Sequence, residues 1–206
     1  KYVDLLEKIL YNGLLSGVGL DGKSFFYINA LQIRHNFKHP DMEAERSGLF
    51  ECRCCPTNIC RLLPSVPGYM YAQQGNDIYV NLFASSLATI QLGKKSLAIE
   101  QQNNYPFNGD LKFIIQSKDK LTFTMKIRIP GWARQEAIPS DLYSFHSNKK
   151  ELIMISINGN PVAYNMDKGY AVITREWKKG DKVEMNLPMD VKRVYSNEKL
   201  KDNQGL

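Results

Sequence analysis

The sequence predicts a mixed fold, in which a helical segment is followed by an antiparallel β-sandwich. Over residues 3–15, apolar side chains recur at spacings of three and four, which is typical of a helix with one apolar face. From about residue 69, apolar and polar residues alternate instead, as they do in half-buried antiparallel strands. Turn sequences separate many short stretches of this kind, and that arrangement favours a sandwich.

The helical segment is predicted to cover residues 1–67. Its first helix should end where Gly17 and Gly19 turn the chain. The stretch "SFFYINAL" (24–31) predicts a short buried strand or extended segment, and the polar residues 32–50 predict a long loop. A second helix is expected, with Thr57 as a candidate cap and the prolines from Pro64 onward as its end. Two helices and a loop cannot bury a core alone, so we expect the tail of a larger helical domain.

The sandwich is predicted to cover residues 68–206. The stretch "LTFTMKIRI" (121–129) alternates strictly between apolar and polar residues, which indicates a strand with one buried face. Asn158-Gly159 lies between two apolar runs and predicts a hairpin. The sequence around Lys179-Gly180-Asp181 is expected to repeat this design with a turn at these residues.

Composition places the chain among soluble globular proteins. It has 206 residues, 43% of them hydrophobic, and a formal net charge of +6. No apolar run approaches the ~18 residues that a membrane helix needs, and no secretion leader follows Lys1. Lysine and arginine are scattered among acidic residues, so neither a nucleic-acid surface nor a membrane partner is expected.

All four cysteines lie in "ECRCCPTNICR" (51–61). A disulfide framework usually spaces its cysteines to join distant segments, so this clustering favours metal binding or thiol chemistry. The spacing does not match the two Cys-x-x-Cys pairs of a zinc knuckle. The residues alone allow two interpretations of Cys52, Cys54 and Cys55, which are a metal or catalytic role and structural burial. Cys60 falls on the apolar side of the predicted helix and is expected to pack there.

Several longer motifs occur in a distinctive order. They are "LLEKILYNGLLSGVGLDGKSFFYINAL", "CRCCPTNICRLLPSVPGYMYA", "DIYVNLF", "IRIPGWA" and "GYAVITREWKKGDKVEMNLPM". Together they resemble the β-L-arabinofuranosidases of glycoside hydrolase family 127 and its sister family 146, from about residue 2 to residue 195. The resemblance implies the C-terminal part of an (α/α)6 barrel followed by β-sandwich structure.

For chemistry, the resemblance implies a retaining glycosidase with a zinc-bound cysteine as nucleophile. By motif position, Cys54 is the nucleophile and Cys54 and Cys55 are zinc ligands, whereas the role of Cys52 is left undecided, with packing beside the site as the expectation. Zinc would keep the thiol ionised, and the thiolate would attack the anomeric carbon. Tyr27 lies in the segment that approaches the pocket in relatives and is a candidate for sugar contact, with a packed aromatic residue on a buried strand as the equal alternative. His35 and His39 of the long loop are expected on the surface.

The family's acid/base glutamate and its two other zinc ligands, a glutamate and a cysteine, lie well upstream of this motif. Only 53 residues precede Cys54, and none shows the expected Glu-x-Cys pairing. The chain by itself is therefore expected to be inactive. Its expected partner is the missing N-terminal part of its parent, and its expected ligand is an arabinose-containing or other plant-type glycan. Family habit suggests a bacterial enzyme of undetermined compartment. A second hypothesis belongs to a different functional class. In it, the chain is a non-catalytic carbohydrate-binding or assembly module with structural cysteines.

Overall fold

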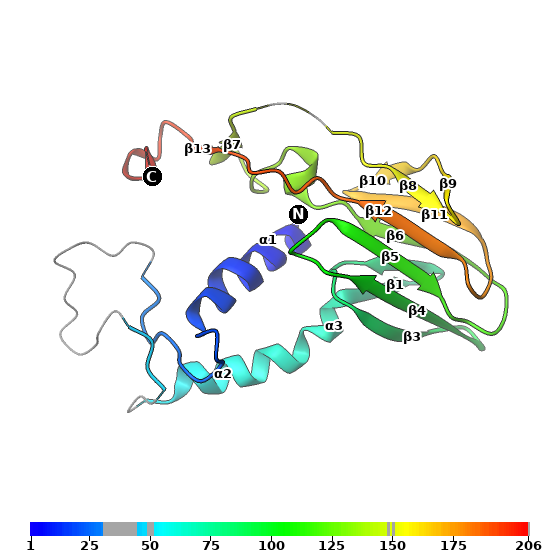
Figure 1. The fold of residues 1–206 in the computed structure, drawn as a ribbon, viewed down its shortest axis with the longest axis horizontal. Helices are drawn as coiled ribbons and strands as arrows, with labels where there is room; N and C mark the ends of the chain where they lie inside the picture. The colour runs from blue at the N-terminus through cyan, green and yellow to red at the C-terminus, as the bar shows by residue number, and fades with distance from the viewer. Residues whose placement is uncertain (31–44, 49–51, 148, 150, 206) are drawn as a thin grey trace. The chain divides into compact units, whose positions relative to one another are not determined.

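The structure of the chain is a computed structural model that describes residues 1–30, 45–48, 52–147, 149 and 151–205. The chain forms two compact units (Figure 1). The helical unit is Leu5–Gly68, and the sheet unit is Lys1–Asp4 together with Tyr69–Leu206. Most regular structure is β-sheet, and among the described residues no helix is long and apolar enough to cross a membrane.

The first helix is less regular than its apolar spacing predicts. The α-helix α1 spans Tyr2–Lys8, continues as a π-helix over Ile9–Leu14 and ends as a 3₁₀ turn over Leu15–Gly17. Side chains within this stretch bond to its carbonyl oxygens. The Asn12 amide donates to the Lys8 oxygen at 3.0 Å, and the Ser16 hydroxyl donates to the Asn12 oxygen at 2.5 Å. These bonds lie within the stretch where the helix changes from α to π and then to 3₁₀ geometry.

The second helix starts earlier than predicted. Helix α2 spans Cys54–Leu62, so Thr57 lies inside it and is not its cap. The Thr57 hydroxyl instead donates to the Arg53 carbonyl at 2.7 Å, one turn back. Pro56 is tolerated because it lies in the first turn, where its missing N–H has no helical partner to lose. A 3₁₀ turn at Leu63–Ser65 follows, and Pro67 begins the short helix α3, Pro67–Met70.

The sheet unit contains a five-stranded, a six-stranded and a two-stranded sheet, in the orders β1-β2-β6-β11-β10, β3-β4-β5-β12-β8-β9 and β13-β7. The strands are β1 Tyr71–Gln74, β2 Asp77–Val80, β3 Ser86–Leu92, β4 Lys95–Asn103, β5 Asp110–Ile115, β6 Leu121–Arg128, β7 Tyr143–Phe145, β8 Ile155–Ile157, β9 Asn160–Pro161, β10 Asn165–Asp167, β11 Tyr170–Trp177, β12 Lys182–Asn186 and β13 Val194–Ser196. Short 3₁₀ turns lie at Gly131–Arg134 and Lys201–Asn203.

Strand pairing confirms one turn prediction, and it corrects a second turn prediction and the expectation of wholly antiparallel sheets. Asn158-Gly159 joins β8 to β9 as a hairpin, with positive φ angles of 53° and 81° that suit a type I′ turn. The turn around Gly180 does not form a hairpin, because β11 pairs with β6 and β10 whereas β12 pairs with β5 and β8. That turn carries the chain from one sheet to the other. The sheets are also not wholly antiparallel, since β2 and β6 run parallel.

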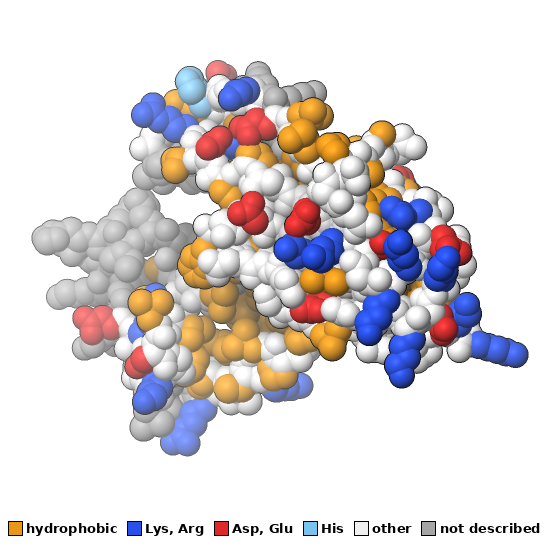
Figure 2. All heavy atoms as spheres, turned by 45° about the vertical axis from the view of Figure 1, so that its right-hand side comes forward, with side chains coloured by type: hydrophobic (Ala, Val, Ile, Leu, Met, Phe, Trp, Pro, Cys, Tyr) orange, Lys and Arg blue, Asp and Glu red, His pale blue; other side chains and the backbone are white. Residues whose placement is uncertain are grey.

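One hydrophobic core takes side chains from both larger sheets, as period-two alternation predicts. Trp177 is fully buried, stacks on Phe123 with ring centroids 5.5 Å apart, and donates from its indole nitrogen to the Phe123 carbonyl. The other core residues include Ile78, Val80, Met125 and Ile127 of the five-stranded sheet and Leu97, Ile99, Phe113, Ile115 and Val183 of the six-stranded sheet. On the face that Figure 2 shows, lysine and arginine side chains lie among aspartate and glutamate side chains.

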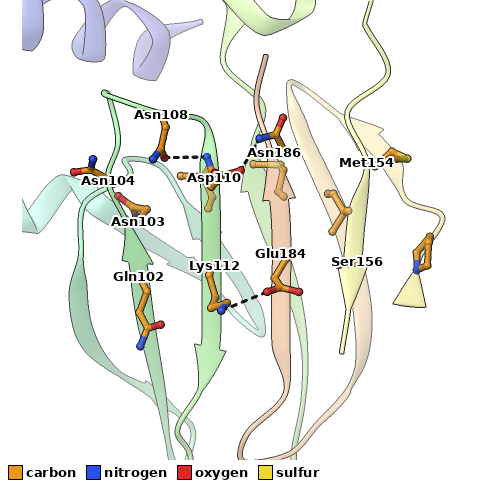
Figure 3. A pocket seen from close by; sticks show the side chains of 14 residues that line it. Gln102, Asn103, Asn104, Asn108, Asp110, Lys112, Met154, Ser156, Glu184 and Asn186 are labelled. Atoms are coloured by element: carbon orange, nitrogen blue, oxygen red, sulfur yellow. Dashed lines mark hydrogen bonds and ion pairs between the residues drawn. The ribbon is translucent and has the colours of Figure 1, made fainter. Parts of the chain in front are cut away.

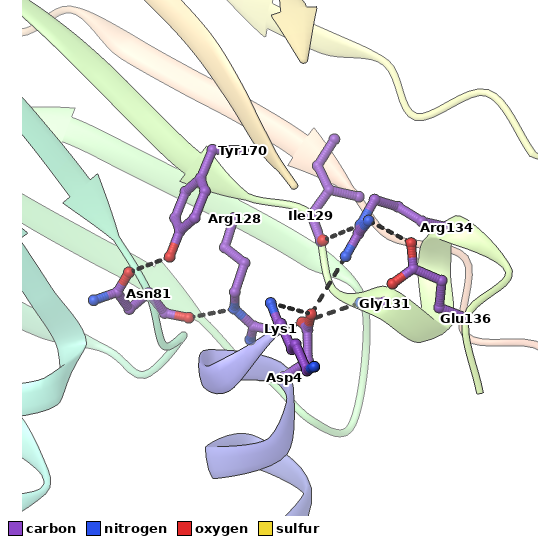
Figure 4. A network of polar contacts seen from close by, with 9 residues as sticks. All are labelled: Lys1, Asp4, Asn81, Arg128, Ile129, Gly131, Arg134, Glu136 and Tyr170. Carbon is purple, nitrogen blue, oxygen red and sulfur yellow. Dashed lines mark hydrogen bonds and ion pairs between the residues drawn. The ribbon is translucent and has the colours of Figure 1, made fainter. Parts of the chain in front are cut away.

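Asp4 is the centre of a polar network within the sheet unit (Figure 4). Its Oδ1 accepts from Arg128 Nη1 at 2.9 Å and from the Gly131 backbone N–H at 3.1 Å, and its Oδ2 pairs with Arg134 Nη2 at 3.3 Å. Arg128 is buried and also donates from Nε to the Asn81 carbonyl. Burial alone would raise the pKa of Asp4, but the bond from Gly131 and the charge and bond of Arg128 outweigh burial and lower it.

We expect Asp4→Ala to lower the free energy of unfolding by about 3 kcal/mol at pH 7, because it leaves the buried Arg128 guanidinium without its carboxylate. The pKa of Asp4 is lower in the folded state than in the unfolded state, where it is about 3.9. Its carboxylate therefore stabilises the fold fully above about pH 3.9, and this stabilisation is lost as the pH falls through the folded-state pKa. The gap between wild type and variant should therefore narrow below about pH 4. Urea unfolding at pH 7, 5 and 3 measures this gap. Asp119→Ala, at an exposed turn, is the matched control, and equal stability of the two variants would contradict the role of Asp4.

Candidate functional site

The cysteine cluster lies at the start of α2. Cys54 and Cys55 are the first two residues of the helix, and their sulfur atoms are 3.8 Å apart. Arg53 is the N-cap residue, and its side chain makes no capping hydrogen bond. The first backbone N–H groups of a helix lack helical partners and carry a partial positive charge. Two thiols therefore lie where negative charge is favoured.

Two side chains brace this helix start from within. The Asn58 amide donates to the Cys54 carbonyl oxygen at 2.9 Å, and the Thr57 hydroxyl donates to the Arg53 carbonyl. Asn58 belongs to the Cys-Cys-Pro-x-Asn motif, although no role was predicted for it from the sequence. Its bond to the backbone of Cys54 assigns it one, which is to hold the first turn of α2 together.

A short extended segment brings Tyr27 to the cluster. Phe25 exchanges backbone hydrogen bonds with Ser47, at 3.0 and 2.9 Å, and the Phe26 N–H donates to the Gly17 carbonyl at 2.9 Å. The Asn29 amide donates to the Gly13 carbonyl and the Ser16 hydroxyl, both at 3.2 Å. This segment was predicted as a buried strand or extended stretch. Over the described residues 24–30 it is mostly half-buried, with isolated bridges at Phe25 and bends at Tyr27 and Ile28.

Tyr27 interacts with three of the cysteines. The pKa of its hydroxyl is raised above the ordinary value of 10.0, first by the negative charges of the Cys52 and Cys54 thiolates, then by desolvation and by Cys55. A hydrogen bond between the Tyr27 and Cys52 side chains acts in the same direction. The structure thus brings together Tyr27, Cys52, Cys54 and Cys55, whereas the sequence did not link Tyr27 to the cysteines. A role for Cys52 beside Tyr27 was not foreseen.

The cysteine pair fits part of a zinc site. Two thiolates bound to one tetrahedral zinc ion, each at about 2.3 Å, would hold their sulfurs ~3.8 Å apart. Cys54 and Cys55 meet this condition. Among the described residues, however, no group of three or more His, Cys, Asp or Glu side chains could hold a metal ion. The described part of the chain thus offers two zinc ligands and not a complete set.

Cys60 differs from its prediction. It was expected to pack on the apolar side of the helix, but its side chain is exposed, and no residue of α2 is buried. Burial requires a partner surface, and the described residues of the helical unit provide none that buries a residue of α2. All four cysteines are free thiols. His35 and His39 lie outside the described residues, as does most of the predicted loop.

Two models of one protein family match this chain. The "Beta-L-arabinofuranosidase, GH127 catalytic domain" matches residues 1–68, and the "Beta-L-arabinofuranosidase, GH127 middle domain" matches residues 77–189. The cysteine cluster lies within the first match and the two larger sheets lie mostly within the second.

Individual relatives agree with the family models. The non-reducing end β-L-arabinofuranosidase of Bifidobacterium longum is 28% identical over the whole chain. A solved GH127 β-arabinofuranosidase is 44% identical over 97% of the chain, with a TM-score of 0.88. A GH127 β-L-arabinofuranosidase from Geobacillus stearothermophilus T6 is 33% identical over 98%, with a TM-score of 0.82. The chain spans about 30% of the length of each of these three relatives.

Proposed function

Because the chain belongs to the GH127 β-L-arabinofuranosidase family, we propose that its cysteine cluster is one part of the active site of a retaining glycoside hydrolase. On this proposal, the helical unit is the later part of an (α/α)6 barrel and the sheet unit is the β-sandwich that follows it. The substrate is an arabinose-containing glycan. The chain without the remaining length of its relatives is inactive, because the acid/base glutamate lies elsewhere.

The pair of thiols at the start of α2 carries this proposal. Cys54 and Cys55 lie within the residues that match the catalytic-domain model, and their sulfurs are 3.8 Å apart at a helix N-terminus. Buried structural cysteines are inert, whereas reactive ones are partly exposed and lie in positive surroundings. Cys54 is exposed and Cys55 is half-buried, and Arg53 directly precedes them.

Cys54 is the nucleophile in this proposal. In the first step its thiolate attacks the anomeric carbon, a carbon–sulfur bond forms, and the bond to the leaving oxygen breaks while that oxygen takes a proton from the general acid. In the second step water attacks the same carbon, the carbon–sulfur bond breaks and the thiolate leaves. The same acid/base group accepts the proton of that water. Two inversions give overall retention, as in glycosidases with a carboxylate nucleophile.

Zinc would be held by Cys54 and Cys55, with its other ligands supplied from outside this chain. When bound, it would keep the thiols ionised at neutral pH. Asn58 holds the carbonyl of Cys54 and so keeps the first turn of α2 in place. Tyr27 interacts with the cysteines from the facing segment, from where its hydroxyl can bond either to Cys52 or to a sugar hydroxyl.

The proposed function is tested by trapping the sugar on the protein. We expect that a polypeptide of the full length of the family relatives, carrying these residues, hydrolyses a β-L-arabinofuranoside and is glycosylated when the reaction is quenched rapidly in acid. Trypsin cleaves after Arg53 and Arg61, so one peptide from Cys54 to Arg61 should carry one pentosyl group. Fragmentation of that peptide by mass spectrometry should locate the group on Cys54 and not on Cys60. Turnover with a pentosyl group on a carboxylate instead would overturn the assignment.

A further inference from the structure

The outer face of the six-stranded sheet contains a hollow whose lining includes both polar and apolar surface (Figure 3). Its volume is about 600 Å³, within the range of about 300–1,000 Å³ that small-molecule sites occupy. Strands β4, β5, β12 and β8 form its floor, and residues of the loop before β5 line one end. The hollow lies entirely within the sheet unit.

Strand register places the polar side chains of the floor in two rows. Gln102 pairs with Lys112, Lys112 with Glu184, and Glu184 with Ser156, so one row crosses four strands. Two residues further along each strand, side chains return to the same face. Asp110 pairs with Asn186 in that second row, and Figure 3 shows Met154 beside it.

Several polar groups in the hollow are available to a ligand. Within the described residues, the Asn104 amide, the Nδ2 group of Asn108 and the Ser156 hydroxyl have no hydrogen-bond partner. The carboxamide of Asn186 donates to Asp110 at 2.6 Å, which leaves its oxygen as an acceptor. A carboxamide offers a donor and an acceptor close together, which matches neighbouring sugar hydroxyls, since each hydroxyl both donates and accepts.

The charges in the hollow are largely compensated. Lys112 pairs with Glu184 at 3.5 Å, and Asp110 accepts the bond from Asn186. One carboxylate is left in excess of the single ammonium group, which disfavours phosphates and uronic acids. These charges disfavour an anionic ligand, and the choice of an uncharged one rests on the unpaired carboxamide and hydroxyl groups.

Apolar groups complete the lining at the other end. Met154 is 69% exposed at the hollow, and Pro161 is also exposed there. Exposed apolar side chains of this kind can pack against the C–H faces of a sugar ring while carboxamides bind its hydroxyls.

We propose that this hollow binds a segment of a neutral oligosaccharide. The class of ligand follows from the unpaired carboxamide and hydroxyl groups of the lining and from the apolar surfaces at the end. This site is additional to the cysteine cluster, and its recognition of a neutral sugar does not depend on the chemistry proposed there. Only the choice of an arabinose-containing probe rests on the proposed function.

Binding is tested on the whole 206-residue chain by NMR, with ¹³C-labelled methionine methyl groups. We expect the Met154 signal to shift saturably with a neutral arabino- or xylo-oligosaccharide, with a Kd of about 1 mM or below. The signal of fully buried Met125 should stay unchanged. An oligogalacturonate of the same length should cause no saturable shift at Met154. Saturation by either neutral sugar supports the site, and because no bond is cleaved, this result is independent of activity.

The double variant Asn104→Ala/Ser156→Ala should weaken binding at least about tenfold, since each removed group contributes a hydrogen bond to the ligand. Neither side chain has a partner within the described residues, so the change breaks no bond of the fold found there. Thr122→Ala, on the exposed face of β6 in the other large sheet, should bind as wild type does. The proposal is overturned if neither neutral sugar saturates Met154 or if the double variant binds equally well. It is also overturned if the Met154 shift follows protein concentration alone, which would indicate a second copy on this face.

Discussion

Replacing Cys54 with alanine is expected to lower kcat/KM on a β-L-arabinofuranoside by on the order of 10⁴-fold or more in a full-length family protein that carries these residues. Alanine removes the attacking sulfur while it keeps a helix-compatible side chain at the first position of α2. The loss of a nucleophile cannot be recovered by binding energy, so KM should change far less than kcat. Steady-state kinetics on the purified variant measure both parameters.

Two further cysteine variants separate the proposed roles. Cys60→Ser is the matched control, because Cys60 is an exposed thiol of the same helix, and its activity should remain within about twofold of wild type. Cys55→Ser should lower both activity and zinc content, measured by elemental analysis, because this side chain is proposed to hold the metal. Near-normal turnover by Cys54→Ala would refute the nucleophile, whatever the zinc content.

Replacing Gly109 with alanine is expected to destabilise the sheet unit by more than about 3 kcal/mol. A Cβ atom at this position would lie 1.9 Å from the Leu187 carbonyl oxygen and 2.8 Å from the Leu187 carbonyl carbon. Both are backbone atoms, and the Leu187 N–H also donates to the Gly109 oxygen at 2.9 Å. The clash can be relieved only by moving one backbone segment away from the other, which would break this bond and disturb the start of β5.

Gly68→Ala provides the control for a change of glycine to alanine. A Cβ atom there meets no heavy atom within 4 Å, and Gly68 lies in the short helix α3. Alanine should therefore leave stability unchanged or slightly raise it. Urea or thermal unfolding followed by circular dichroism compares the two variants. The close approach at Leu187 would be contradicted if Gly109→Ala unfolded at the same denaturant concentration as Gly68→Ala.

The candidate site was predictable where it depends on a local motif. The clustering of Cys52, Cys54 and Cys55 pointed away from a disulfide framework, and these thiols are free in the structure. The contact of Tyr27 with these cysteines was not predictable from spacing, because 24 residues lie between Tyr27 and Cys52 in the sequence. Backbone bonds from Phe25 and Phe26 to distant residues decide where Tyr27 lies. Cys60 was mispredicted because apolar neighbours along a helix do not establish that another surface covers them.

By itself, the sequence determined the features that depend on neighbouring residues. Period-two alternation identified the buried face of β6, and Asn158-Gly159 identified the hairpin between β8 and β9, because side-chain direction and turn geometry are local properties. Only the tertiary structure decided which strands pair. It placed β11 and β12 in different sheets, made β2 parallel to β6, and brought Gly109 against Leu187. These choices depend on packing between segments far apart in the chain, which the alternation of a single strand does not encode.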